Sequence, residues 1–191
     1  MSQNEKKPES KAKTVILCTV CLLMICLVVT GAVSGANYAF ADKIAEQEWA
    51  ATQTAMTAVL PADDYEEIHW DDTGEADGYR AITGGETAGY LFITAAKGYG
   101  PSISILTGIA DGAVTGIAIL DCSDETPGLG KKVDSAKFTD QFIGVTETPA
   151  IVKVAPSADN EIQAITGATK STKGVTDSVS KAFELYAEVA E

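Results

Sequence analysis

The sequence predicts an α+β protein, in which one membrane helix is followed by a domain with a small, twisted, mainly antiparallel sheet and packed helices. Three observations carry this prediction. An uncharged run near the start extends from Thr14 to Ala41, short β-branched or aromatic segments separated by glycines lie between Tyr79 and Asp121, and apolar residues recur at helical spacing after Ser171. A chain of 191 residues has room for one ordinary domain and such an appendage.

The N-terminal run is long enough to cross a bilayer. Its apolar core, Val15 to Ala36, would measure about 33 Å as a helix, close to the thickness of the hydrocarbon layer. Lysines flank the run on its N-terminal side and acids on the other: Lys6, Lys7, Lys11 and Lys13, then Asp42, Glu46 and Glu48. This asymmetry predicts a basic cytoplasmic tail at 1–13, a single transmembrane helix at 14–41 in the cytoplasmic membrane, and an extracytoplasmic remainder.

Two other fates of this segment stay open. Ala39-Phe40-Ala41 resembles a signal-peptidase site, which would release a soluble protein. The apolar run is longer than the core of a usual signal peptide, so we favour an uncleaved anchor. A lipoprotein is disfavoured because Cys26 follows Ile25 rather than a small residue.

Cysteine and histidine usage excludes several chemistries. Cys18, Cys21 and Cys26 fall in the membrane run, where they behave as small apolar residues, and Cys122 alone lies outside, where we expect a buried thiol and no disulfide. His69 is the only histidine, so the chain cannot build a histidine-based triad or zinc site, and we exclude hydrolase and metalloenzyme functions. The net charge of −13 disfavours nucleic acid as a partner.

The segment between membrane and sheet combines a helix with an acidic linker. Apolar positions from Tyr38 to Leu60 have helical spacing and end at Pro61. Residues 62–78 are rich in acids without ligand spacing, which favours a solvated loop. We therefore expect a helix and linker at 42–78.

The remainder predicts the sheet and its helices. Strand-like runs occupy residues 79–83, 89–96, 102–108 and 113–120, and Asp111-Gly112 is typical of a hairpin turn. A helix at 135–143 carries Phe138 and Phe142 at i, i+4 spacing, so we expect helices on one face of the sheet. Two short runs at 150–155 and 161–165, with a turn at 156–160, precede a last helix whose N-cap would be Ser171 or Thr172.

The junction between the last short run and the last helix holds the candidate site. Thr169 lies where free backbone N–H groups and the positive end of the helix dipole favour a phosphate. Gly167 gives the backbone freedom to turn and lets a bulky ligand approach. Taken alone, Thr166-Gly167-Ala168-Thr169 is a weak signal, and an ordinary turn is the favoured interpretation.

The segment Gln163-Ala164-Ile165-Thr166-Gly167-Ala168-Thr169 resembles the flavinylation motif of FMN-binding-domain proteins. These include the G subunit of the Rnf ferredoxin:NAD oxidoreductase and the C subunit of the sodium-translocating NADH:quinone oxidoreductase. The resemblance implies that Thr169 bears FMN through a phosphoester bond made by a flavin transferase. Thr166, Gly167 and Ala168 complete the motif, and Lys170 would offset phosphate charge. The chain departs from the family at Gln163, where an acidic residue is usual.

Two further loops extend the resemblance. The run Glu125-Thr126-Pro127-Gly128-Leu129-Gly130 looks like a signature of the Rnf protein, and a glycine-rich turn of similar composition occurs at Gly98-Tyr99-Gly100. The resemblance implies that these two loops line the flavin. It covers the chain from about Tyr79 to the C-terminus, which places an FMN-binding domain at 79–191.

The function that this resemblance implies is electron transfer. We expect a membrane-anchored subunit with covalent FMN, assembled with other membrane subunits of an Rnf-type ion-translocating ferredoxin:NAD oxidoreductase, rather than an enzyme on its own. One helix offers no ion pathway by itself. A stand-alone flavinylated carrier outside the cytoplasm, or a non-redox binding domain that has lost the flavin, are the alternatives.

Overall fold

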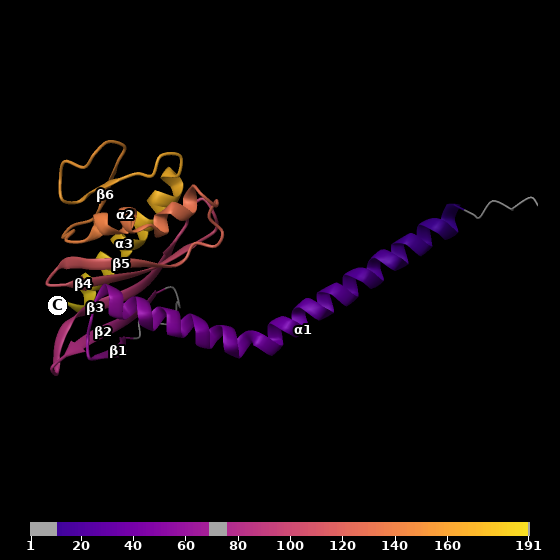
Figure 1. The fold of residues 1–191 in the computed structure, drawn as a ribbon, viewed down its shortest axis with the longest axis horizontal. Coiled ribbons are helices and arrows are strands. Elements are labelled where there is room, and N and C mark those ends of the chain that lie inside the picture. Colours follow the sequence, from indigo (N-terminus) through magenta and orange to yellow (C-terminus); the bar gives the residue numbers. More distant parts are fainter. Residues whose placement is uncertain (1–10, 69–75, 191) are drawn as a thin grey trace, which may run out of the picture. The chain divides into compact units, whose positions relative to one another are not determined.

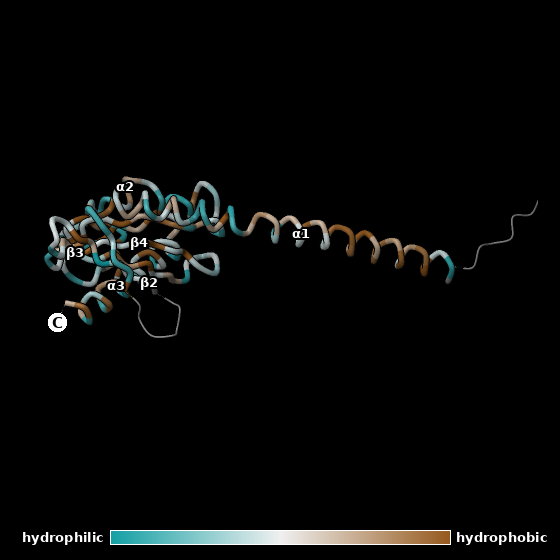
Figure 2. The backbone as a smooth tube through the Cα atoms, turned by 90° about the horizontal axis from the view of Figure 1, so that it is seen from below, coloured by the Kyte–Doolittle hydropathy of each residue, from teal (hydrophilic) through white to brown (hydrophobic). Residues whose placement is uncertain are grey.

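The computed structural model describes residues 11–68 and 76–190, and the chain divides into two units, Met1–Trp49 and Ala50–Glu191. Predictions about the tail at 1–10, and about His69 and the acids at 71, 72 and 75, lie outside the described residues. The first helix, α1, runs over Lys11–Val59, and its end just before Pro61 confirms the predicted stop. In the part of the chain that the structure describes, α1 is the one helix long and apolar enough to cross a membrane. Figure 2 shows its apolar stretch in brown.

A five-stranded antiparallel meander forms the centre of the second unit, in the order β1-β2-β3-β4-β5 (Figure 1). The strands are β1 Asp64–Ile68, β2 Ala76–Thr83, β3 Glu86–Ala96, β4 Ile103–Ala110 and β5 Ala113–Asp121. The antiparallel sheet and the α+β class are as predicted. The hairpin between β4 and β5 turns at Asp111 and Gly112, both with positive φ, as the Asp-Gly pair predicts.

Strand β1 is the main addition, because it lies in the acidic stretch for which the sequence predicted a loop. Its partner is β2, and Glu66 lies within ion-pair distance of Arg80, at 3.6 Å. Tyr65 of β1 packs against the core, and its hydroxyl donates to the Leu60 carbonyl at 2.8 Å. One anchored aromatic and backbone pairing therefore hold a strand whose other side chains are mostly acidic.

Apolar clusters cover both faces of the sheet, whereas the sequence predicted helices on one face only. Successive residues Leu91 and Phe92 of β3 are both fully buried, because they point to opposite faces. Phe92 belongs to the cluster that includes Val175 of the last helix, α3 (Thr169–Val189). Leu91 belongs to a second cluster with Met56 and other residues from the end of α1. The end of α1, which belongs to the second unit, is thus part of the core.

The segment after the sheet is helical but more broken than predicted. It comprises η1 Gly130–Asp134, α2 Ala136–Thr139 and η2 Asp140–Phe142, in place of one helix over 135–143. The predicted aromatic pair is confirmed: the Phe138 and Phe142 rings meet edge to face with centroids 5.5 Å apart. The two following strands, β6 Ala150–Val152 and β7 Glu161–Gln163, are shorter than predicted and pair in parallel.

The last helix, α3, covers Thr169–Val189 and starts two residues before the predicted Ser171. Its N-cap is Ala168, which makes no side-chain capping bond, so neither Ser171 nor Thr172 is the cap. Both hydroxyls bond other groups. Thr172 Oγ1 accepts the Ile165 N–H at 3.1 Å and donates to the Ala168 carbonyl at 3.1 Å, which ties the preceding loop to the first turn of α3.

Candidate functional site

Thr169 is the first residue of α3 and its side chain is exposed. A hydrogen bond from the Ala168 N–H to the Ile165 carbonyl (2.9 Å) closes a turn before it, and Gly167 in that turn has φ +83°. A side chain at Gly167 would be strained in this conformation. The first bond of the helix runs from the Thr172 N–H to the Ala168 carbonyl (2.9 Å). The earlier amides of α3 therefore have no partner one turn before them and favour an anion at this end.

A cavity of about 490 Å³ opens beside Thr169. This volume is in the range of small-molecule sites. Its lining comes from the Gly98–Gly100 turn, the loop before η1 and the start of α3: Tyr99, Thr126, Leu129, Gly130, Gly167, Ala168, Thr169, Lys170 and Ser171. The structure thus brings together the three segments that the sequence singled out, although they are far apart along the chain.

Two large apolar side chains are exposed at this cavity. Tyr99 is 68% exposed, and the Nζ atom of Lys170 lies 5.9 Å from the centroid of its ring. Leu129 is 37% exposed and packs over Gly167, where its Cδ1 lies 3.1 Å from the position that a Cβ would take. Exposed apolar surface that gathers at a cavity indicates a binding site more strongly than scattered exposed residues do.

Glu125 does not line the cavity, although the resemblance implied that it would. Its side chain is 1% exposed and lies behind the cavity wall. Oε1 accepts the backbone N–H groups of Tyr99 (2.8 Å) and Gly100 (3.0 Å), and Oε2 accepts the Ser171 hydroxyl (2.5 Å). The sequence did not predict a role for Ser171 at the site. The sequence signal that could have indicated this role is its position, two residues after Thr169 in the same predicted helix.

The other glycines of the two loops make room or shape the chain. A Cβ on Gly98 would lie 2.3 Å from Glu125 Oε1, and one on Gly100 would lie 2.8 Å from Asp124 Cβ. Pro127 and Gly128 are exposed and outside the cavity lining, and Gly128 has φ +74°. None of these four residues lines the cavity.

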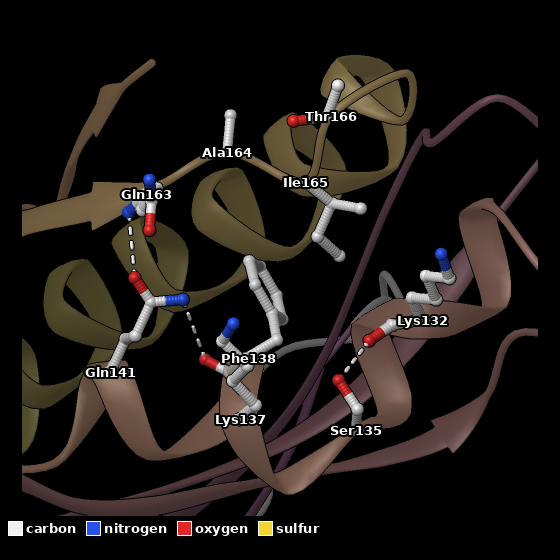
Figure 3. A pocket seen from close by; sticks show the side chains of 9 residues that line it. All are labelled: Lys132, Ser135, Lys137, Phe138, Gln141, Gln163, Ala164, Ile165 and Thr166. Atoms are coloured by element: carbon white, nitrogen blue, oxygen red, sulfur yellow. Dashed lines mark hydrogen bonds between the residues drawn. The ribbon is translucent and has the colours of Figure 1, made fainter. Parts of the chain in front are cut away.

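Thr166 lines a different cavity, of about 380 Å³, on the other side of the motif (Figure 3). Lys132 and Lys137 face it from η1 and α2, and the Gln163 N–H donates to Gln141 Oε1 at 2.8 Å across its edge. Gln163 thus lines the same cavity as two lysines.

Cys122 is half-buried against the core cluster, near the loop that holds Glu125. Burial raises the pKa of this thiol, and the Asp134 carboxylate raises it further. The thiol is therefore protonated at neutral pH and is not an activated nucleophile.

Comparison with known proteins places the chain in a family. Residues 98–184 match the model of the FMN-binding domain. The chain is 33% identical to the G subunit of the Na(+)-translocating ferredoxin:NAD(+) oxidoreductase complex of Acetobacterium woodii, over 99% of this chain and 100% of that protein. It belongs to this family of G subunits.

Two other similarities agree with that assignment. The G subunit of the proton-translocating ferredoxin:NAD(+) oxidoreductase complex of Clostridium ljungdahlii is 32% identical over 85% of this chain and 86% of its own length. The crystal structure of the C subunit of the Na(+)-translocating NADH-quinone reductase from Parabacteroides distasonis superposes with a TM-score of 0.50, at 17% identity, over 68% of this chain and 77% of that one. The latter likeness concerns the fold alone.

The residues at the cavity fit a flavin mononucleotide. All of its lining residues lie inside the matched segment 98–184. The exposed hydroxyl of Thr169 stands at a helix N-terminus that favours phosphate, and Tyr99 and Leu129 offer apolar surface for a planar ring system. Gly130 and Gly167 also line the cavity and place no side chain in it.

Proposed function

We propose that this chain is the membrane-anchored flavoprotein subunit of an ion-translocating ferredoxin:NAD oxidoreductase complex, with FMN esterified to Thr169. The observation that carries the proposal is the position of Thr169, the exposed first residue of a helix on the wall of a ligand-sized cavity. Membership of the G-subunit family supports the assignment to such a complex.

The residues of the site have separate tasks in this proposal. Thr169 Oγ1 would carry the phosphate, and the first amides of α3 together with the Lys170 ammonium would offset its charge. Tyr99 and Leu129 would contact the ring system, and Gly167 would let it lie close to the backbone. The flavin would supply the redox chemistry, so the protein needs to provide position, polarity and an exposed edge.

The membrane helix defines where this chemistry takes place. We propose that α1 stays as a single-pass anchor, with the lysine-rich tail in the cytoplasm and the FMN-binding domain, 79–191, outside. A covalent bond would then retain the flavin where the cytoplasmic FMN pool cannot replace it. Companion membrane subunits would move the ions and carry out the remaining electron transfers, and a flavin transferase would attach the FMN.

Intact-protein and peptide mass spectrometry on chain co-expressed with a flavin transferase tests the attachment. We expect one FMN-sized addition on the peptide that contains Thr169. It should be absent in Thr169→Ala, present in Thr169→Ser, and present in Thr146→Ala, which removes an exposed threonine hydroxyl from a loop outside the site. An addition on another residue, such as Thr126 in the same cavity, would refute the assignment of Thr169.

Co-purification from native membranes tests the complex separately. The proposal expects the flavinylated chain to migrate with other membrane subunits in a mild detergent. A flavinylated chain that migrates alone would indicate a stand-alone carrier instead. A chain that never acquires flavin would indicate a binding domain that has lost it.

A further inference from the structure

We infer that Glu125 is a positioning residue that holds the two walls of the flavin cavity together and keeps a negative charge directly behind them. This inference concerns a side chain that does not itself face the cavity, and its electrostatic part rests on the proposed function.

The carboxylate joins three segments that are remote in sequence. Oε1 accepts two backbone N–H groups of the turn that carries Tyr99, at 2.8 and 3.0 Å, and Oε2 accepts the hydroxyl of Ser171 in the first turn of α3, at 2.5 Å. Tyr99 and Ser171 both line the cavity. Glu125 therefore fixes the distance between the aromatic wall and the helix that bears Thr169.

The surrounding chain is shaped to accept this side chain. Two glycines leave the space that it fills: a Cβ would lie 2.3 Å from Oε1 at Gly98 and 2.4 Å from Oε2 at Gly130. At Gly174 of α3 a Cβ would lie 3.0 Å from the Gly98 Cα, so the helix approaches the turn closely enough for one glutamate to reach both. A buried carboxylate is costly unless its hydrogen bonds are satisfied, and here each oxygen has a donor.

The charge of this group acts on the cavity. Within the residues that the structure describes, the hydrogen-bond partners of Glu125 are two amides and a hydroxyl rather than a cation. All three are donors, which suits a deprotonated carboxylate. The group is 1% exposed, so water screens its field weakly. A negative charge directly behind the wall disfavours the arrival of electrons on a flavin in the cavity and lowers its reduction potential.

The test separates geometry from charge. In the unflavinylated full-length chain in detergent, hydrogen exchange at the Tyr99 and Gly100 amides is compared between wild type and Glu125→Ala. We expect exchange to accelerate by about tenfold or more, because hydrogen bonds to a buried carboxylate are lost. Glu125→Gln keeps an oxygen for these amides and should preserve most of the protection. If Glu125→Ala fails to fold, Glu125→Gln still provides a folded variant for the comparison. Unchanged exchange in Glu125→Ala, or full loss of protection in a folded Glu125→Gln, would overturn the positioning role.

The reduction potential of the attached flavin gives the second readout. Glu125→Gln should raise the midpoint potential, whereas Glu147→Gln, which removes the same formal charge from an exposed loop, should leave it unchanged. Equal potentials in Glu125→Gln and wild type would overturn the electrostatic role. If no flavin attaches to the wild-type chain, the proposed function fails, and the exchange experiment still decides whether Glu125 holds the turn against α3.

Discussion

Replacement of Gly98 by alanine is the sharpest test of the buried architecture behind the cavity. The new methyl group would lie 2.3 Å from Glu125 Oε1 and 2.6 Å from Ile103 Cδ1, and both of these side chains are fully buried, at 1% and 0% exposure. Gly98 cannot move toward α3, because its backbone already lies close to Gly174. The substitution must therefore displace the glutamate, the isoleucine or the turn.

The expected cost follows from two terms. Overpacking of a closed core costs about 1–3 kcal/mol. Displacement of Glu125 from its donors adds about 1–3 kcal/mol. We expect a total of roughly 4 kcal/mol, which for a domain of this size lowers the Tm by about 8–16 °C.

The matched control is Gly116→Ala, at another buried glycine without positive φ, where the nearest atoms to a Cβ belong to Val59 at 3.7 Å. That substitution should change stability by less than about 1 kcal/mol, since it fits in ordinary contact and restricts the unfolded chain. Thermal unfolding of the full-length chain in detergent, followed by near-ultraviolet circular dichroism, measures both. A Tm for Gly98→Ala within about 2 °C of the wild-type value would refute the tight packing of the turn on Glu125.

Three further predictions follow from other parts of the structure. Phe142→Ala should lower the free energy of unfolding in urea by about 3–5 kcal/mol, because the ring is fully buried, whereas Ile143→Ala, at a 58% exposed side chain, should cost under about 1 kcal/mol. Hydrogen bonds from the Ser157 backbone and then its hydroxyl lower the pKa of Glu161, so the stability that this carboxylate contributes is present above its unfolded pKa and lost as pH falls through the lowered one. Ser157→Ala removes only the hydroxyl bond and should raise the pKa of Glu161 part of the way to its ordinary value in an NMR titration. An unchanged pKa would show that the Ser157 hydroxyl does not lower it. Gln163→Asp introduces the acidic residue that is usual at this place in the motif. The flavinylated fraction in intact-mass spectra should then rise. An equal or lower fraction would show that this position does not limit flavin attachment.

Local signals explain what the sequence predicted well. The turn at Gly167 and the helix after it depend on neighbouring residues, and the helical spacing of Val175, Val179 and Ala182 corresponds to a buried face of α3 in the structure. The antiparallel sheet was predicted from short runs separated by glycines, which are also local signals. The gathering of the two loops at the motif came from the family resemblance, because no local pattern connects residues so far apart.

Long-range contacts explain what the sequence did not predict. The partners of Glu125 lie 25, 26 and 46 residues away, so its burial and its position behind the wall cannot be inferred from a Glu-Thr-Pro-Gly run alone. Ser171 was predicted as a helix cap, but its hydroxyl donates a hydrogen bond to Glu125 instead. Strand β1 was missed because its composition is mostly acidic. Its anchoring residue, Tyr65, bonds the Leu60 carbonyl just after α1 and pairs with β2.

The fold favours Thr169 over the nearby hydroxyls as the proposed acceptor. Thr166 has an exposed hydroxyl on the same motif, but it faces the other cavity. Ser171 lines the correct cavity, but its hydroxyl is 1% exposed and is bonded to Glu125. Thr126 is exposed at the cavity but lies in the loop before η1 rather than in the first turn of α3. Only at position 169, of these four, do an exposed hydroxyl, the cavity and a helix N-terminus coincide. In the proposed function, the turn at Gly167 and the start of α3 therefore leave Thr169 as the favoured acceptor of this short motif.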